Sequence, residues 1–226
     1  MSQPIEMIIA GATGLVGKST LEAALQCEKI THVYSLSRRP ITIKAAKLTQ
    51  WLDEKLDIPS FINPPKFPIV AVIALGTTIK KAGSKKQLHA IDVELVIKVA
   101  KDMLTLGVEH IIVISCLGAS PKGVSHYLRC KGEMEMRLQQ LTFKTITFLQ
   151  PGPLAGPRDD PRMDERVLQC VMQVISPCML GSLQNYKPID ATDVAKVIIH
   201  LATEQLDIEK KQVKRLTSSQ MQSLIS

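Results

Sequence analysis

Short apolar runs alternate with longer amphipathic stretches along the chain. Residues 69–75 (IVAVIAL) and 110–115 (HIIVIS) are almost continuously apolar, which is typical of strands buried on both faces of a sheet. Residues 91–106 repeat apolar side chains at helical spacing, so we expect a helix with one buried face there. The same patterns predict strands at 6–10, 31–36, 48–51, 69–75, 110–115, 145–149 and 212–216, and helices at 15–26, 91–106, 126–141, 163–175, 191–203 and 218–224.

The order of these elements predicts an α/β fold. Strands that alternate with helices form βαβ units, and such units build a parallel sheet with helices on both faces. We therefore predict a three-layer Rossmann fold with a doubly wound, mostly parallel sheet and a small C-terminal extension. A chain of 226 residues is long enough for one sizeable core and leaves little for a second, so we expect residues 1–226 to form a single domain.

Composition narrows the functional classes. The chain is 45% hydrophobic and 22% charged, and none of its apolar runs approaches the roughly 18 residues that a membrane span requires. The first residues lack the basic region of a secretory signal, so we expect a cytoplasmic protein with no membrane partner. The five cysteines are odd in number and show no CxxC spacing, which predicts neither a disulfide framework nor a metal site.

The chain carries an excess of positive charge. Its net charge of +7 comes from 28 basic and 21 acidic residues, and lysines cluster within residues 80–86 and 210–214. A basic cluster can bind nucleic acid. These clusters contain no interleaved aromatic residues, and aromatics make up only 4% of the chain. We therefore interpret the lysines as a solvated surface and expect no nucleic-acid partner.

A glycine-rich segment, GATGLVG, follows the first predicted strand and opens the first predicted helix. In this context a glycine loop binds the pyrophosphate of a dinucleotide. Gly11 would allow a tight turn, Gly14 would let the backbone approach the phosphates, and Gly17 would let the helix pack on the strand. The helix N-terminus would add free N–H groups and a partial positive charge. The predicted cofactor contacts here are Gly11, Thr13, Gly14, Leu15 and Val16.

The end of the second predicted strand indicates which dinucleotide is bound. NAD-binding proteins place an acid there, about 20 residues past the glycines, to hold the ribose hydroxyls. This chain has Ser37-Arg38-Arg39 at that point and no acid. Arginine binds phosphate through two parallel hydrogen bonds, so this segment predicts NADP(H) rather than NAD(H). The alternative is that the two arginines only form an exposed turn.

Tyr127 and Lys131 lie four residues apart on a predicted helix and therefore share a face. A nearby ammonium favours the phenolate, so we expect Lys131 to lower the tyrosine pKa from its ordinary value of about 10 and to prepare Tyr127 for proton transfer to a carbonyl oxygen. Ser115 ends the preceding strand, at the edge where parallel sheets bind ligands. The predicted catalytic residues are Ser115, Tyr127 and Lys131, with Ser120 and Ser125 as weaker candidates for the serine. The alternative is a coincidental pair on the surface.

These motifs together resemble a known superfamily, the atypical short-chain dehydrogenase/reductases. The resemblance covers nearly the whole chain, and the closest branch is that of the Tat-interacting oxidoreductase-like proteins, which are often described as nucleoside-diphosphate-sugar epimerases. It rests on five motifs in the superfamily's order: GATGLVG (11–17), ALGTT (74–78), SCLGAS (115–120), YxxxK (127–131) and QPGPL (150–154).

The resemblance implies a seven-stranded Rossmann sheet with bound NADP(H). It implies that Leu75-Gly76-Thr77 lies along the adenosine side of the cofactor and that Pro151 lies near the nicotinamide ring. It also implies that Tyr127 and Lys131 are the catalytic pair, with Lys131 bonding the nicotinamide ribose as well. The chain departs from the superfamily at two positions within these motifs, which are Gln150 and Cys116. Relatives often carry arginine and a second small polar residue there, so the departures affect the expected substrate contacts.

Three functions are compatible with these residues. The first is an NADP(H)-dependent oxidoreductase that acts on a small carbonyl or alcohol substrate through the tyrosine, lysine and serine. The second is a non-catalytic NADP(H)-binding regulator that senses redox state, because some atypical members bind the cofactor without a known reaction. The third is a nucleoside-diphosphate-sugar epimerase. Superfamily members often pair through helices, which leaves a homodimer or another protein partner open.

Overall fold

The computed structural model describes residues 3–59, 65–155, 188–204 and 211–225. The helix expected at 163–175 lies outside these residues. The strands are β1 (Ile5–Ala10), β2 (Ile30–Ser37), β3 (Leu48–Leu52), β4 (Ile69–Ile73), β5 (His110–Ile114), β6 (Thr145–Gln150), β7 (Leu154–Ala155), β8 (Ile189–Asp190) and β9 (Gln212–Thr217). The helices are α1 (Leu15–Gln26), α2 (Ile79–Ala82), α3 (Lys85–His89), η1 (Ala90–Leu95), α4 (Val96–Thr105), α5 (His126–Gln139), α7 (Ala191–Thr203) and α8 (Ser218–Ile225).

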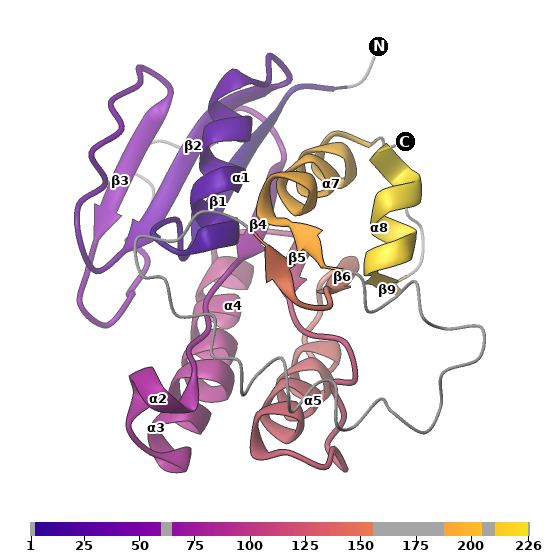
Figure 1. Ribbon diagram of the computed structural model, residues 1–226. Coiled ribbons are helices and arrows are strands. Elements are labelled where there is room, and N and C mark those ends of the chain that lie inside the picture. The colour runs from indigo at the N-terminus through magenta and orange to yellow at the C-terminus, as the bar shows by residue number, and fades with distance from the viewer. Residues whose placement is uncertain (1–2, 60–64, 156–187, 205–210, 226) are drawn as a thin grey trace.

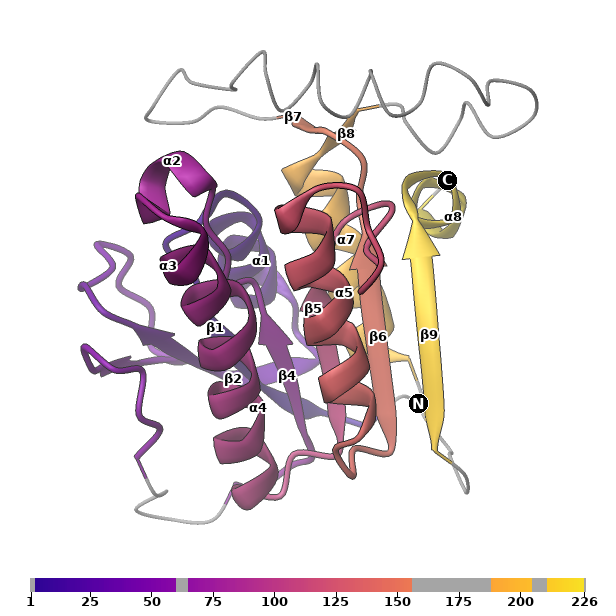
Figure 2. The same cartoon turned by 90° about the horizontal axis from the view of Figure 1, so that it is seen from below.

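Among the described residues, seven strands form one sheet in the order β3-β2-β1-β4-β5-β6-β9, and every neighbouring pair is parallel. The order reverses at β1, because β2 and β3 lie on one side of it and the later strands on the other. Figure 2 shows these strands running the same way, so their carboxyl ends share one edge of the sheet. The predicted doubly wound Rossmann fold is confirmed.

Helices cover both faces of the sheet (Figure 1). On one face α4 packs beside α5, and on the other face α1 packs beside α7. α8 lies next to α7. In the parts of the chain that the structure describes, no helix is both long and apolar enough to cross a membrane.

The burial of β4 on both faces shows why several apolar runs in the sequence are continuous. All five of its residues are buried. Ile69, Ala71 and Ile73 belong to the core on the α4–α5 face. Val70 and Val72 belong to the core on the α1–α7 face. Successive side chains of a strand point to opposite faces, so a strand covered on both faces must be apolar at every position.

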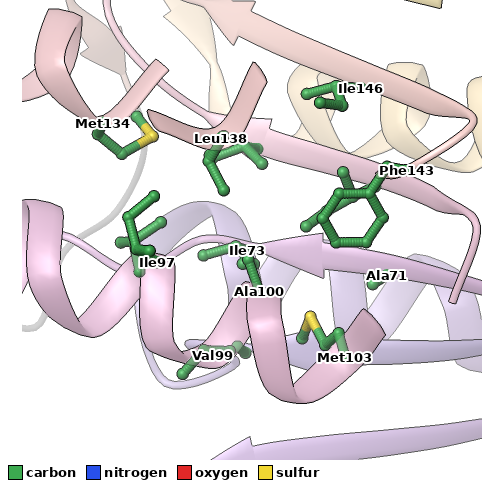
Figure 3. Packing of buried hydrophobic residues seen from close by; sticks show 14 of the residues in the cluster. Ala71, Ile73, Ile97, Val99, Ala100, Met103, Met134, Leu138, Phe143 and Ile146 are labelled. Carbon is green, nitrogen blue, oxygen red and sulfur yellow. The ribbon is translucent and has the colours of Figure 1, made fainter. Parts of the chain in front are cut away.

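The core on the α4–α5 face holds the helices firmly against the sheet (Figure 3). Met103 from α4, Leu138 from α5, Ile73 from β4 and Phe143 from the turn before β6 are almost completely buried. Full burial of one such side chain stabilises a fold by about 1.5–3 kcal/mol. This layer therefore fixes where the residues at the ends of the strands and helices lie.

The helix expected at 91–106 begins earlier than predicted and is not a regular α-helix. Ser84 caps α3 by accepting a hydrogen bond from the Gln87 amide at 3.1 Å. The chain then stays helical through the π-helical segment η1 into α4. A π-helical turn holds an extra residue and changes which side chains point inward. Asp92, which lies in η1, is 0% exposed.

Candidate functional site

The carboxyl edge of the sheet gathers the segments that the sequence singled out. The strand order reverses between β1 and β4, which are neighbours in the sheet. Open α/β sheets bind ligands at such a switch point, in the crevice outside the carboxyl ends of the strands. The segments, in the order of the strands that they end or follow, are Gly11–Gly17 after β1, Ser37-Arg38-Arg39 at β2, Leu75-Gly76-Thr77 after β4, Ser115 after β5 and Pro151 after β6.

The glycine loop fits tightly where glycine is needed. Gly11 has a φ of +93°, and a Cβ atom there would lie 2.7 Å from the Ala74 carbonyl oxygen. A Cβ atom at Gly17 would overlap the Gly11 carbonyl group, so the turn and the close helix–strand packing both require glycine. Gly14 is the N-cap of α1, and within the described chain no side chain caps this helix. Uncapped amides of this kind suit an anion, and the predicted cofactor contacts of this loop stay a prediction.

The two arginines at the end of β2 are exposed, while Ser37 is buried. The Ser37 hydroxyl donates to the Arg39 carbonyl oxygen at 2.8 Å, which shapes the turn. Neither guanidinium forms an ion pair with any described acid. One acid that the sequence argument overlooked lies nearby, because the Asp53 amide donates to the Ser37 carbonyl oxygen at 3.2 Å. Its carboxylate accepts from two backbone amides, and these hydrogen bonds hold the pKa of Asp53 below its ordinary value.

Leu75-Gly76-Thr77 leads from β4 into a buried ion pair that the sequence did not reveal. The Thr77 amide donates to Asp92 Oδ1 at 2.8 Å. Asp92 Oδ2 lies 3.1 Å from Lys131 Nζ, and the two side chains are only 0% and 4% exposed. This contact lacks hydrogen-bond geometry, so it is an ion pair alone. A Cβ atom at Gly76 would lie 3.4 Å from Lys131 Nζ, so glycine leaves room for the lysine.

Tyr127 lies beside Lys131, but its hydroxyl is in a different state from the one expected. Lys131 Nζ is 6.0 Å from the centre of the Tyr127 ring. The residue is 37% exposed, yet its hydroxyl is enclosed by protein and contacts the Cys116 thiol. Burial of the hydroxyl, followed by the influence of Cys116 and Asp92, raises the pKa of Tyr127 well above its ordinary value. The expected lowering is wrong, because burial of the hydroxyl raises the pKa first of all and Cys116 and Asp92 raise it further.

Ser115 is held in a polar network that the sequence also missed. The Ser115 hydroxyl donates to Glu135 Oε1 at 2.5 Å, and the side-chain amide of Gln150 donates to the same oxygen at 2.8 Å. Arg215 Nε donates to Glu135 Oε2 at 2.9 Å. Glu135 is 3% exposed although it is charged. It lies one turn after Lys131 on the same helical face, and that spacing is the signal that could have found it.

The other candidates at this edge have structural contacts. The Ser125 hydroxyl caps α5 by accepting from the Leu128 amide at 3.1 Å. The Ser120 amide donates to the Leu128 carbonyl oxygen at 3.1 Å, which ties its loop to α5. Pro151 is buried, and its carbonyl oxygen accepts from the Leu117 amide at 3.0 Å. These contacts fix the loops on either side of Tyr127.

A cluster of potential metal ligands lies on the outer surface of α3, η1 and α5. Single ligand atoms of His89, Glu94 and Glu133 lie within 4.8 Å of one another. Arg137 already bonds both acids: Nη1 and Nη2 donate to the two Glu94 oxygens at 2.5 and 3.0 Å, and Nη1 lies 3.4 Å from Glu133 Oε1. The Arg137 hydrogen bond holds the pKa of Glu94 below its ordinary value. We interpret the cluster as an ion-pair network that joins the helices.

Comparison with solved structures places the fold among NAD-binding Rossmann proteins. MoeE5 in complex with UDP-glucose and NAD superposes with a TM-score of 0.65 at 13% identity, over 93% of this chain and 75% of that one. UDP-glucuronic acid 4-epimerase from Bacillus cereus in complex with NAD gives 0.62 at 14%, over 94% and 78%. The oxidoreductase ylbE from Lactococcus lactis gives 0.58 at 18%, over 97% and 96%. Identities this low show a shared fold alone.

Comparison with known sequences corrects two expectations. "Protein FMP52, mitochondrial" of Saccharomyces cerevisiae is 30% identical over 212 residues, which cover 91% of this chain and 90% of that protein. Its namesake in Candida albicans is 31% identical over 210 residues, or 90% of each chain. These names contradict the cytoplasmic expectation, which went too far because lacking a secretory signal excludes only one route out of the cytoplasm. The comparisons also do not single out the Tat-interacting branch.

A family match extends over the middle of the chain. Residues 45–182, more than half of the sequence, match the HIM1 family. This range includes Leu75-Gly76-Thr77, Asp92, Tyr127 and Lys131. Together with relatives that align over about nine-tenths of their length, the match shows that the chain belongs to the HIM1 family.

Proposed function

We propose that this protein binds a nicotinamide dinucleotide, with NADP(H) preferred over NAD(H), and uses it to interconvert a small carbonyl compound and its alcohol. The observation that carries the proposal is the glycine loop. It turns through a conformation that only glycine accepts readily and presents the uncapped N-terminus of α1 at the switch point of the sheet. Such a terminus offers free amides and a partial positive charge to the pyrophosphate.

The preference for NADP(H) rests on Arg38 and Arg39. Both are exposed at the end of β2, and neither forms an ion pair with a described acid. A 2′-phosphate would find two free guanidinium groups there, and guanidinium binds phosphate through parallel hydrogen bonds. Asp53, the nearby acid, accepts from the amides of Lys55 and Asp57 through one oxygen, Oδ1. The proposed preference therefore rests on the two arginines.

The chemical role of the protein's residues is proton transfer and orientation. The cofactor supplies hydride to the carbonyl carbon in reduction and accepts it in oxidation. Tyr127 carries its proton at neutral pH, and its hydroxyl would donate that proton to the carbonyl oxygen once its raised pKa is lowered. Lys131 is the nearby cation that would stabilise the resulting phenolate. Hydride and proton together convert the carbonyl to the alcohol.

Titration of the purified protein with NADPH and with NADH, followed by nicotinamide fluorescence, tests the proposal. We expect tight binding of NADPH and weak binding of NADH. The double variant Arg38→Glu/Arg39→Glu should weaken NADPH binding by at least tenfold, about 1.4 kcal/mol or more. The matched control, Lys29→Glu/Lys101→Glu, makes the same change in charge at the amino end of β2 and on the outer surface of α4. Failure to bind either nucleotide, or equal losses in both double variants, would reject the proposal.

A second function, a redox-sensing regulator, is favoured by one set of contacts. Lys131 is paired with Asp92, Ser115 is bonded to Glu135, and Tyr127 has a raised pKa, so the site without ligand is not prepared for proton transfer. Tyr127→Phe separates the two functions. It should abolish NADPH-dependent reduction in a screen of small aldehydes and ketones if the protein is an enzyme. A regulator would show no turnover with or without the hydroxyl, while still binding NADPH.

The location that we propose is the mitochondrion. The proposal is supported by the names of the FMP52 relatives. Fluorescence microscopy of the protein fused at its C-terminus to a fluorescent protein, beside a mitochondrial dye, tests it. Diffuse fluorescence that does not overlap the dye would refute it.

A further inference from the structure

Asp92 has no place in the sequence-predicted site, yet it is the most deeply buried acid at the carboxyl edge. It is 0% exposed and lies in the π-helical segment η1, between the loop after β4 and the helix that carries Lys131. A buried carboxylate is costly unless its partners compensate it. Irregular π-helical turns frequently occur at functional sites.

We propose that Asp92 is a positioning residue that fixes Lys131 beside Tyr127 and offsets its charge, and that it releases the lysine when a nucleotide occupies the loop after β4. The proposal deepens the proposed function, on which it rests for the identity of the nucleotide. The effect of Asp92 on Lys131 and Tyr127 in protein without nucleotide does not depend on that function.

The carboxylate joins the two parts that would have to move together. Its Oδ1 accepts from the Thr77 amide at 2.8 Å, so one oxygen is fixed by the loop after β4. Its Oδ2 faces Lys131 Nζ at 3.1 Å without a hydrogen bond. The lysine is therefore held by charge and by a long contact of 3.5 Å to the Ile114 carbonyl oxygen. A shift of Thr77 on binding would move Asp92 and change its hold on the lysine.

The pairing determines how the lysine acts on the tyrosine. Lys131 Nζ lies 6.0 Å from the centre of the Tyr127 ring, and its positive charge is offset by Asp92 at half that distance. The carboxylate itself disfavours the phenolate and contributes to the raised pKa of Tyr127. An ammonium stabilises a phenolate less when an anion lies close to it and offsets its charge. Releasing Lys131 would thus switch the tyrosine from a poor proton donor to an effective one.

The groups around the pair come from two elements. Tyr127, Lys131 and Cys130 face Asp92 from α5, and Cys116 faces it from the loop after β5. Burial raises the pKa of Cys116 to about 12, so this thiol stays neutral at physiological pH. Burial also raises the pKa of Cys130. Lys131 is therefore the one cation among these described neighbours of Asp92, and its position decides the local balance of charge.

The test measures the ionisation of Tyr127 directly. The chain has three tyrosines, so a protein labelled with ¹³C at tyrosine Cζ gives three NMR signals, and Tyr127→Phe assigns the relevant one. In the ligand-free protein, Asp92→Asn should lower the pKa of Tyr127 by about one unit or more, a tenfold change in the ionisation constant. Asp102→Asn removes a partly exposed acid of α4 that pairs with Lys98, and it should leave the pKa of Tyr127 unchanged. An unchanged pKa in folded Asp92→Asn protein would overturn the proposal.

Two further measurements keep the outcomes distinct. Asp92→Ser keeps an oxygen for the Thr77 amide and removes the charge, so it replaces Asp92→Asn if that variant does not fold. In the wild-type protein, saturation with NADPH should lower the pKa of Tyr127 even though the nucleotide is negative. A raised or unchanged value in protein that binds NADPH would refute the release step. If NADPH does not bind, the proposed function fails, while the ligand-free variants still decide the role of Asp92.

Discussion

Replacing Glu135 by alanine should destabilise the protein strongly, because its carboxylate joins three strand ends to α5. The acid is 3% exposed and accepts hydrogen bonds from Ser115, Gln150 and Arg215 at 2.5, 2.8 and 2.9 Å. Alanine would leave the buried Ser115 hydroxyl without its partner, and a buried unsatisfied group costs about 1–3 kcal/mol. The half-buried Gln150 amide would lose less, since water can reach it.

The remaining contributions are smaller. The Arg215 side chain is 42% exposed, so it can return to water, and we assign it no more than about 1 kcal/mol. The space left by the shortened side chain adds about 1 kcal/mol. The sum for Glu135→Ala is about 2–5 kcal/mol, which in a chain of this length corresponds to a fall in Tm of roughly 2–4 °C per kcal/mol.

Urea unfolding followed by circular dichroism measures this loss. The matched control is Glu133→Ala on the same helix, because the Glu133 side chain is 35% exposed and its partners His89 and Arg137 are partly exposed. We expect the control to lose less than about 1 kcal/mol. Equal losses in the two variants, or a loss below about 1 kcal/mol for Glu135→Ala, would show that the network does not hold the strand ends together.

Two further predictions concern the glycine loop and the thiol beside the tyrosine. Gly17→Ala places a Cβ atom on the Gly11 carbonyl group, so we expect a loss of about 3 kcal/mol or more and weaker nucleotide binding, both measurable by thermal shift with and without NADPH. The pKa of Cys116 is raised to about 12 in the folded protein, so its contribution to stability is complete below pH 9 and is lost as pH rises from 9 to about 12. Urea melts at pH 8 and pH 10.5 should therefore show a smaller decline for Cys116→Ser than for the wild type, and identical declines would contradict this assignment.

The sheet was predictable because its strands are apolar on both faces. A strand such as β4 leaves no choice of exposed side, so the apolar run itself marks the element, and parallel pairing follows from the helices between the strands. The glycine loop was predictable for a similar reason. Each of its required conformations is local, and Gly11 and Gly17 stand where no other residue fits.

The polar partners were not predictable because they depend on contacts between distant segments. Asp92 lies four residues before Val96 and seven before Val99, both buried, so helical spacing places it on the inward face, but the sequence does not reveal its partner Lys131 on α5. Glu135 on a helix reads as a solvated charge, and its partner Arg215 comes from β9, 80 residues later in the chain. The lowered pKa expected for Tyr127 was wrong for the same reason, since the sequence showed the lysine beside it but neither the burial of its hydroxyl nor the nearby Cys116 and Asp92.

The position of β9 at the end of the sheet has a consequence for how the protein is made. β9 pairs with β6 along its whole length and carries Arg215 to Glu135. A nascent chain that has emerged only as far as β6 would therefore expose the open edge of that strand and bury an acid without its cation. The ligand site can reach its final form only after residues 212–217 leave the ribosome. Until then the partly synthesised domain should be a target for chaperones and proteases, and stop codons that fall just before β9 should yield little stable protein.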